Sequence, residues 1–164
     1  HIFGFDNETL AEVIGRMLLE KGQTLAVAES CTGGYISHLI TSISGSSGWY
    51  KGGVTAYSNE IKQHLLGVSA ELLENHGAVS EQVVRKMAEG VRRKMNSDFS
   101  VATSGIAGPT GGTEEKPVGT VWIAVATPDK TVAEKFVFGD NRERNIIRSS
   151  QTALQLLRRS IINQ

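Results

Sequence analysis

The sequence predicts an α/β fold, a three-layer α/β/α sandwich with a mixed sheet that includes one antiparallel hairpin. Short apolar runs alternate with segments of helical periodicity, which is typical of strands joined by helices; the runs lie at 24–29, 54–57 and 99–103. Two further β-rich runs, 118–126 and 131–138, are separated by Thr127-Pro128-Asp129-Lys130, a hairpin signal. The 164 residues, of which 40% are apolar, suit one domain with one substantial core.

The overall composition excludes several classes of protein. Lys+Arg and Asp+Glu both number 17, so no net charge points to nucleic acid or to a membrane surface. No apolar stretch approaches the roughly 18 residues of a membrane span, and no signal peptide is visible. The single cysteine excludes an internal disulfide and suits a reducing cytoplasm. The four histidines are scattered without HExxH or CxxC spacing, so we expect no metal and no other cofactor.

The first half of the chain is predicted as follows. An apolar face from Leu10 to Leu18 indicates a helix, capped by Asp6 or Asn7 and stopped at Gly22. The strand at 24–29 leads into a helix over about 34–43, and 45–48 is a loop.

Polar caps mark the next helices. After the strand at 54–57, Ser58 or Asn59 caps a helix that ends at Gly67. Ser69 and Ser80 cap two more helices, the second running to about 96.

The last helix carries an apolar stripe from Ile147 to Ile161. Its first two turns hold Arg142, Arg144 and Arg148, although cations are unfavourable beside the positive end of a helix dipole. This placement suggests an anionic partner, and a solvated basic face is the alternative.

The junction between the strand at 24–29 and the following helix is the first candidate site. It holds Ser30, Cys31, Thr32, Gly33 and Gly34. A strand-to-helix junction offers backbone N–H groups and a positive dipole end, which can hold an anion or activate a nucleophile. The alternative is an ordinary helix start with Ser30 or Thr32 as its N-cap.

Tyr57 and Lys62 form a second candidate. Tyr57 ends a predicted strand and Lys62 lies about one turn into the next helix, so both can face the space above the carboxyl ends of the strands. The alternatives are a half-buried strand aromatic for Tyr57 and a solvated surface lysine for Lys62.

The third candidate is the glycine-rich segment that follows the strand at 99–103. It contains Ser104, Gly105, Gly108, Gly111 and Gly112. It lacks both the Walker ending and the GxGxxG pattern, so neither nucleotide fingerprint applies. Its N–H groups can still cradle a phosphate, and a flexible connector is the alternative.

These segments together resemble the C-terminal domain of the competence/damage-inducible CinA family, the PncC-type nicotinamide-mononucleotide amidohydrolases. The matching stretches are 28–34, Tyr57-Ser58-Asn59 with Lys62, 104–109 with Gly111-Gly112, and 117–121. The opening residues 3–10 resemble the junction after the larger N-terminal domain of two-domain CinA proteins. The resemblance thus implies one amidohydrolase domain over 1–164, a fragment of a longer protein whose ADP-ribose pyrophosphatase activity would lie outside it.

The resemblance implies hydrolysis of the carboxamide of nicotinamide mononucleotide to nicotinic acid mononucleotide and ammonia, in the cytoplasm. Ser30 would be the nucleophile, with Lys62 and Tyr57 as proton-transfer partners. A lysine can act as the base only if its pKa falls well below about 10.4. The backbone N–H groups of 31–34 would hold the oxyanion.

The phosphate would be held by the glycine-rich segment and an arginine. The family's Gly-Asp-Arg is interrupted here by Asn141, so either Arg142 or Arg144 can fill that role. The expected partners are the small-molecule substrate and a second copy of the chain in a homodimer, with neither nucleic acid nor membrane. Two other functions stay open: a catalytically weak nucleotide-binding regulatory domain linked to competence or DNA damage, and an amidase that uses the Cys31 thiol.

Overall fold

The computed structural model describes residues 8–164. Its five strands are β1 (Leu25–Glu29), β2 (Tyr50–Thr55), β3 (Phe99–Gly105), β4 (Thr120–Ala126) and β5 (Thr131–Val137). Its α-helices are α1 (Leu10–Lys21), α2 (Tyr35–Thr41), α3 (Asn59–Leu66), α4 (Ala70–His76), α5 (Glu81–Met95) and α6 (Arg142–Ile162).

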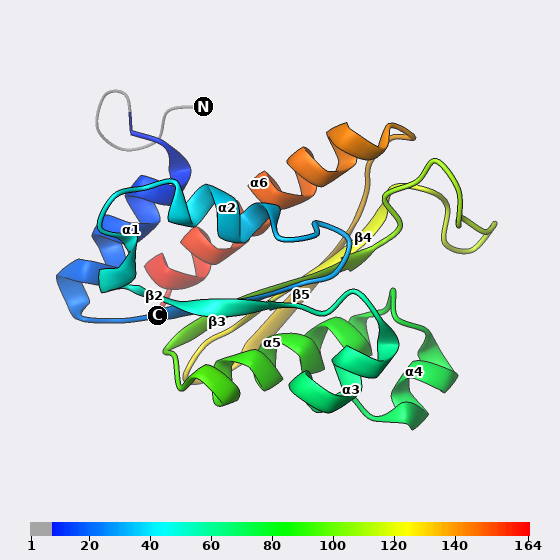
Figure 1. Ribbon diagram of the computed structural model, residues 1–164, viewed down its shortest axis with the longest axis horizontal. Coiled ribbons are helices and arrows are strands. Elements are labelled where there is room, and N and C mark those ends of the chain that lie inside the picture. The colour runs from blue at the N-terminus through cyan, green and yellow to red at the C-terminus, as the bar shows by residue number, and fades with distance from the viewer. Residues whose placement is uncertain (1–7) are drawn as a thin grey trace.

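The strands form one mixed sheet in the order β2-β1-β3-β4-β5. β1 pairs in parallel with β2 and β3, so Ala28 lies between Val54 and Ala102. β3–β4 and β4–β5 are antiparallel. Helices α1, α2 and α6 cover one face, and α3, α4 and α5 cover the other (Figure 1). The predicted α/β/α sandwich with a mixed sheet and one hairpin is therefore confirmed.

The three central strands β1, β3 and β4 bury both of their faces, and in β1 the side chains on the two faces differ in size. Leu25 and Val27 point toward the α1–α2–α6 layer, whereas Ala26 and Ala28 belong to the cluster with α5. Every residue of β1 is buried. A central parallel strand covered on both sides has this burial, and its carboxyl end delivers Glu29 and Ser30 to the site described below.

Several helix boundaries follow the predicted caps. Ser58, Ser69 and Ser80 each accept a hydrogen bond from a backbone N–H of the first turn of α3, α4 and α5. The N-cap of α1 is Thr9, which forms a capping box with Glu12. The predicted caps Asp6 and Asn7 lie outside the described residues, and the observed cap corrects that prediction.

Three other predictions need correction. β2 runs over Tyr50–Thr55, not 54–57, because parallel pairing with β1 extends it through Gly52 and Gly53 despite their low strand propensity. The loop at 45–48 contains a short 3-10 helix, Ser46–Gly48. Helix α2 begins after Gly34, which has a φ of 104° and no side-chain cap, so neither Ser30 nor Thr32 is its N-cap.

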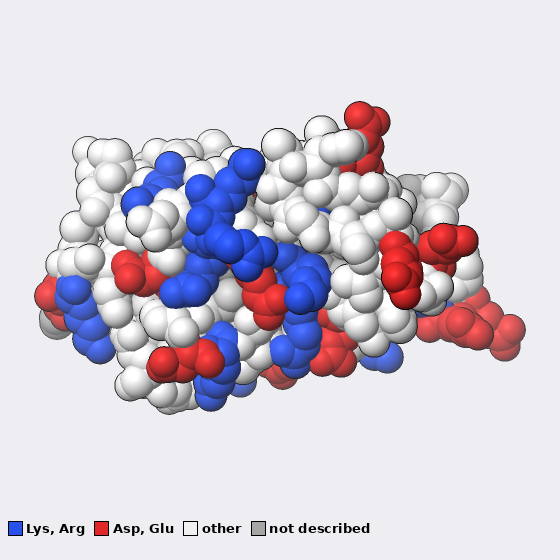
Figure 2. Space-filling model, turned by 90° about the horizontal axis from the view of Figure 1, so that it is seen from below, with Lys and Arg blue, Asp and Glu red and all other residues white. Residues whose placement is uncertain are grey.

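The outer face of the α3–α4–α5 layer carries many basic side chains with acidic ones among them (Figure 2). Arg85 pairs with Glu81 at 2.8 Å and Lys86 approaches Glu89 at 3.5 Å, all on α5. Such i,i+3 and i,i+4 pairs are typical of a solvated helix face.

Over residues 8–164, the structure contains no helix with the length and hydrophobicity needed to cross a membrane.

Candidate active site

A cavity of about 280 Å³ lies at the carboxyl ends of β1, β2 and β3. Open α/β sheets bind their ligands at this edge. It is lined by Ser30, Cys31, Tyr57, Asn59, Lys62, Ala78, Val79, Ser104, Gly105, Ile106, Ala107, Gly108, Thr110, Gly111 and Arg142. All three candidate segments of the sequence therefore contribute to one cavity, and none of these described lining residues is acidic.

Ser30 and Lys62 are in direct contact. The Lys62 side chain is only 2% exposed, and its Nζ lies 3.1 Å from Ser30 Oγ. The same Nζ donates to the backbone carbonyl of Ala56 at 2.7 Å. This carbonyl follows β2, so the chain between β2 and α3 fixes the ammonium position. The interpretation of Lys62 as a solvated surface lysine is wrong.

Burial changes the chemistry of Lys62. Removal of water lowers its pKa, and the neighbouring Cys31 opposes this only partly. When neutral, the amine can still donate a proton to Ala56 O and accept one from Ser30 Oγ. The arrangement therefore suits a general base beside a nucleophilic serine.

Cys31 lies next to Ser30 and also lines the cavity. Its side chain is buried, and the loss of water raises its pKa to about 12. A thiol with such a pKa is almost entirely protonated at neutral pH, whereas reactive cysteines have lowered pKa values. This property disfavours the thiol amidase.

Glu29 holds the turn that carries Ser30. Its carboxylate is 1% exposed and accepts hydrogen bonds from Thr32 Oγ1, from the N–H of Ile36, and from both the N–H and the hydroxyl of Ser37. The positive end of α2 is thus bound by a protein carboxylate instead of being open to a substrate anion. Sequence reasoning missed this role, because Glu29 ends β1 and the N-cap of α2 is Gly34, so Glu29 does not occupy a local capping position.

Thr32, Gly33 and Gly34 shape the turn and do not line the cavity. Thr32 Oγ1 bridges Glu29 and Thr103, and the Gly33 N–H donates to the Ser30 carbonyl. Both glycines have positive φ, 62° and 104°, which explains why this turn needs them.

Tyr57 and Arg142 close one side of the cavity. Arg142 Nη2 donates to the Tyr57 hydroxyl at 2.9 Å, and Nη1 donates to the Gly108 carbonyl at 2.7 Å. The Tyr57 side chain is 62% exposed, so it is not a half-buried aromatic. Among the described residues the Arg142 guanidinium has no carboxylate partner, so its positive charge faces the cavity unneutralised. Arg144 is exposed and does not line the cavity.

The glycine-rich segment divides into lining and packing positions. Gly105, Gly108 and Gly111 line the cavity together with Ser104, whose hydroxyl donates to the Ala78 carbonyl. Gly112 does not line it; a Cβ there would lie 2.6 Å from the backbone nitrogen of Val118. Gly112 therefore permits a close backbone approach within the loop.

Comparison with known proteins shows the family of this chain. The family model of the CinA C-terminal domain matches residues 7–161. The chain belongs to the CinA C-terminal domain family. Curated CinA-like proteins of Cytophaga hutchinsonii and Endomicrobium trichonymphae are 49% and 53% identical to it over 98% and 99% of its length. The chain spans 38% of the length of each of these relatives.

Solved structures of the family share the whole fold. A competence/damage-inducible protein from Agrobacterium tumefaciens is 38% identical with a TM-score of 0.91, covering 100% of this chain and 99% of the other. A CinA-superfamily protein from Klebsiella pneumoniae is 31% identical with a TM-score of 0.90, covering 96% and 100%. The CinA C-terminal domain therefore also occurs as nearly the whole of a crystallised chain.

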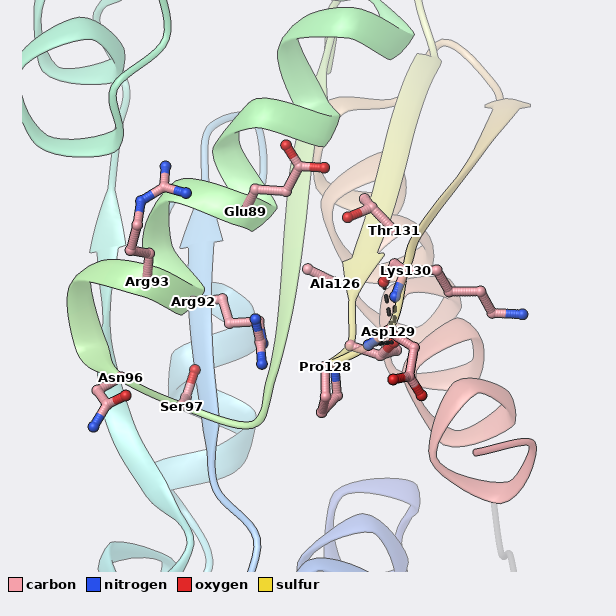
Figure 3. A pocket seen from close by; sticks show the side chains of 11 residues that line it. Glu89, Arg92, Arg93, Asn96, Ser97, Ala126, Pro128, Asp129, Lys130 and Thr131 are labelled. Carbon is pink, nitrogen blue, oxygen red and sulfur yellow. Dashed lines mark hydrogen bonds between the residues drawn. The ribbon is translucent and has the colours of Figure 1, made fainter.

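A larger cavity of about 520 Å³ lies at the opposite edge of the sheet, between the end of α5 and the turn between β4 and β5 (Figure 3). Its cations do not converge, since the Arg93 and Lys130 side chains point away from each other. Arg92 points toward this space, but its Nε donates to the Asp98 carbonyl, a structural contact.

Across residues 8–164 the structure brings together no group of three or more His, Cys, Asp or Glu side chains that could hold a metal.

Proposed function

We propose that the chain is an amidohydrolase that converts nicotinamide mononucleotide to nicotinic acid mononucleotide and ammonia. The observation that carries this proposal is the contact between the buried Lys62 amine and the Ser30 hydroxyl, 3.1 Å apart in a cavity at the carboxyl edge of the sheet. Membership of the CinA C-terminal domain family supports it, because the matching motifs resemble those of the PncC-type amidohydrolases.

The proposed reaction begins with neutral Lys62. Its Nζ accepts the Ser30 Oγ proton while Oγ attacks the amide carbon, which forms a tetrahedral oxyanion. The Gly33 N–H is already donated to Ser30 O, so the N–H of Cys31, the turn residue that lines the cavity beside Ser30, is the proposed oxyanion donor. Collapse of the intermediate breaks the C–N bond, and the Lys62 ammonium returns the proton to the leaving ammonia.

Water then completes the cycle. Lys62 takes a proton from a water molecule, the resulting hydroxide attacks the ester carbon, and Ser30 Oγ leaves with the proton from Lys62. The Tyr57 hydroxyl accepts from Arg142, so its own O–H stays free to donate to the substrate. We therefore assign Tyr57 to proton transfer or orientation at the leaving nitrogen.

The charges around the cavity favour a monoanionic or dianionic ligand. Its described lining contains the Arg142 guanidinium and no carboxylate, and Lys62 adds a positive charge only when it is protonated. Arg142 and the N–H groups of the glycine-rich segment are the proposed phosphate ligands, since a guanidinium and a chain of N–H groups both suit phosphate oxygens. Arg144 is not included in this proposal because it lies away from the cavity lining.

The decisive experiment measures ammonia release from nicotinamide mononucleotide by the unaltered protein, Ser30→Ala and Cys31→Ala. Ser30→Ala should lose about a thousandfold or more in kcat, because the covalent route disappears. Cys31→Ala should keep most of its activity. Full activity in Ser30→Ala together with none in Cys31→Ala would replace the serine mechanism with a thiol mechanism.

Substrate choice tests the phosphate ligands. Nicotinamide riboside and free nicotinamide should have much lower kcat/KM, since the phosphate contacts orient the amide as well as bind it. Equal efficiency on the riboside would remove the phosphate role from Arg142. Tight binding of the mononucleotide without any turnover would indicate the nucleotide-binding regulatory domain instead.

The proposal also includes a homodimer in the bacterial cytoplasm. Light scattering of the purified chain measures the oligomeric state directly, and a monomeric mass at working concentration contradicts the dimer.

A further inference from the structure

Asn145 on α6 is a buried polar side chain that the proposed reaction does not use. It is 1% exposed and does not line the cavity. Its Nδ2 donates to the carbonyls of Ala107 and Gly139, each at 2.9 Å, and its Oδ1 accepts from the Gly139 N–H at 3.1 Å. One side chain thus satisfies three backbone groups from two different loops.

These contacts require a carboxamide. Two carbonyls need two N–H donors on one side, and the Gly139 N–H needs an acceptor on the other. Rotation of the amide by 180° would set its oxygen against the two carbonyls and its NH₂ against an N–H. An aspartate has no N–H to donate, and a leucine of similar size would leave the carbonyl of the buried Ala107 and both Gly139 backbone groups without this partner.

The first loop that Asn145 holds is the wall of the candidate active site. Ala107 lines the cavity, and the next residue, Gly108, accepts a hydrogen bond from Arg142. Arg142 and Asn145 lie three positions apart on the first turn of α6 and bind consecutive carbonyls of this wall. The placement of the guanidinium relative to the glycine-rich segment therefore depends on Asn145.

We propose that Asn145 is a positioning residue that fixes the glycine-rich loop against α6 and thereby sets the affinity of the site for the substrate's phosphate. The inference rests on the proposed function, because it takes Arg142 and this loop as the phosphate ligands. Ser30 follows β1 and Lys62 lies on α3, and among the described residues neither side chain forms a hydrogen bond with Asn145 or its partners. A change at Asn145 should accordingly act on binding of the phosphate and much less on the chemical step.

The main test compares Asn145→Ala with Ser150→Ala. Ser150 is also buried in α6 and donates to the Ile146 carbonyl, but among the described residues it forms no side-chain hydrogen bond with the cavity wall. Asn145→Ala should raise the KM for nicotinamide mononucleotide about ten- to a hundredfold, while kcat changes by only a few-fold. Ser150→Ala should leave both constants close to those of the unaltered protein. Equal effects of the two variants on KM, or a loss in kcat alone for Asn145→Ala, would overturn the positioning role.

Binding measurements separate this inference from the proposed reaction. In the Ser30→Ala background, calorimetry gives the Kd of nicotinamide mononucleotide and of nicotinamide riboside without turnover. Adding Asn145→Ala should weaken binding of the mononucleotide about ten- to a hundredfold and binding of the riboside only slightly. Equal weakening of both ligands overturns the inference. If the unaltered protein binds the mononucleotide but releases no ammonia, the proposed reaction fails while this comparison still decides on Asn145.

A further measurement needs no variant that might unfold. Inorganic phosphate is titrated into the isotope-labelled, unaltered protein, and the amide resonances are followed by NMR. The Asn145 side-chain NH₂ and the Gly139 N–H should shift in step with the N–H resonances of the glycine-rich loop. Shifts in the loop without any change at these two groups would contradict the coupling.

Discussion

Two neighbours of Ser30 show how burial assigns chemical roles at the level of single residues. Removal of water disfavours the charged form of both: it raises the pKa of Cys31 to about 12 and lowers the pKa of Lys62. For the thiol, the favoured neutral form is the unreactive one. For the lysine, the favoured neutral form is the base. The same burial therefore keeps the Cys31 thiol unreactive, although a thiol is intrinsically the stronger nucleophile, and it provides the Ser30 hydroxyl with a base.

The first prediction concerns the pH dependence of Lys62. If its neutral form is the base, kcat/KM should rise with pH, with an apparent pKa below the ordinary lysine value. Lys62→Arg should be nearly inactive, because a guanidinium does not deprotonate at working pH. The measurement is a pH profile of ammonia release for the unaltered protein and both Lys62→Arg and Lys62→Met.

Stability provides a control for these variants. Below the ordinary lysine value and above the lowered pKa, the unfolded chain binds more protons than the native one, so the free energy of unfolding rises with pH in that window. Lys62→Met should remove this contribution and remain folded. Near wild-type turnover in Lys62→Arg would exclude Lys62 from the mechanism and leave Tyr57 as the remaining titratable partner.

At the level of elements, local signals predicted most helix starts, and contacts distant in sequence decided the rest. Ser58, Ser69 and Ser80 are N-caps because each binds an N–H only three positions away. The predicted start of β2 was wrong because pairing with β1 outweighs the low strand propensity of the glycines in β2.

The candidate site divides in the same way. The alternation of strands and helices predicted that Ser30, Lys62 and the glycine-rich segment follow the carboxyl ends of strands, where an open α/β sheet binds its ligands. The sequence could not decide between Arg142 and Arg144, and it did not show that Lys62 is buried. Both features depend on how α6 and α3 pack against the sheet. Asn145 was missed because its partners, Ala107 and Gly139, give no local pattern.

The second prediction belongs to helix α2 and its carboxylate cap. In Glu29→Gln, the new NH₂ group would face the backbone N–H of either Ile36 or Ser37, depending on which carboxylate oxygen it replaces, and so would place donor against donor. We expect a loss of about 2 to 4 kcal/mol in the free energy of unfolding. Denaturant unfolding measures it. Glu60→Gln, an exposed acid in the first turn of α3, is the matched control and should change stability by less than about 0.5 kcal/mol.

At the level of the whole molecule, the candidate site joins segments that are far apart in the chain. Ser30 follows β1, Lys62 lies on α3, Gly108 follows β3 and Arg142 begins α6. These elements come from both helical layers and from the centre of the sheet, as their positions in Figure 1 show. A ligand that contacts all of them is bound only while the fold as a whole is intact.

The third prediction follows from this arrangement. Nicotinamide mononucleotide should stabilise the Ser30→Ala protein, which binds it without turnover, by about 2.7 kcal/mol at a concentration of 100 times its Kd. For a chain of this size, that corresponds to a rise in Tm of roughly 5 to 11 °C in a thermal melt. Nicotinamide riboside at the same concentration should raise the Tm much less, and Ser30→Ala/Arg142→Ala should respond weakly to both. An equal rise with the riboside, or an unchanged response in the double variant, would show that the phosphate is not bound through Arg142.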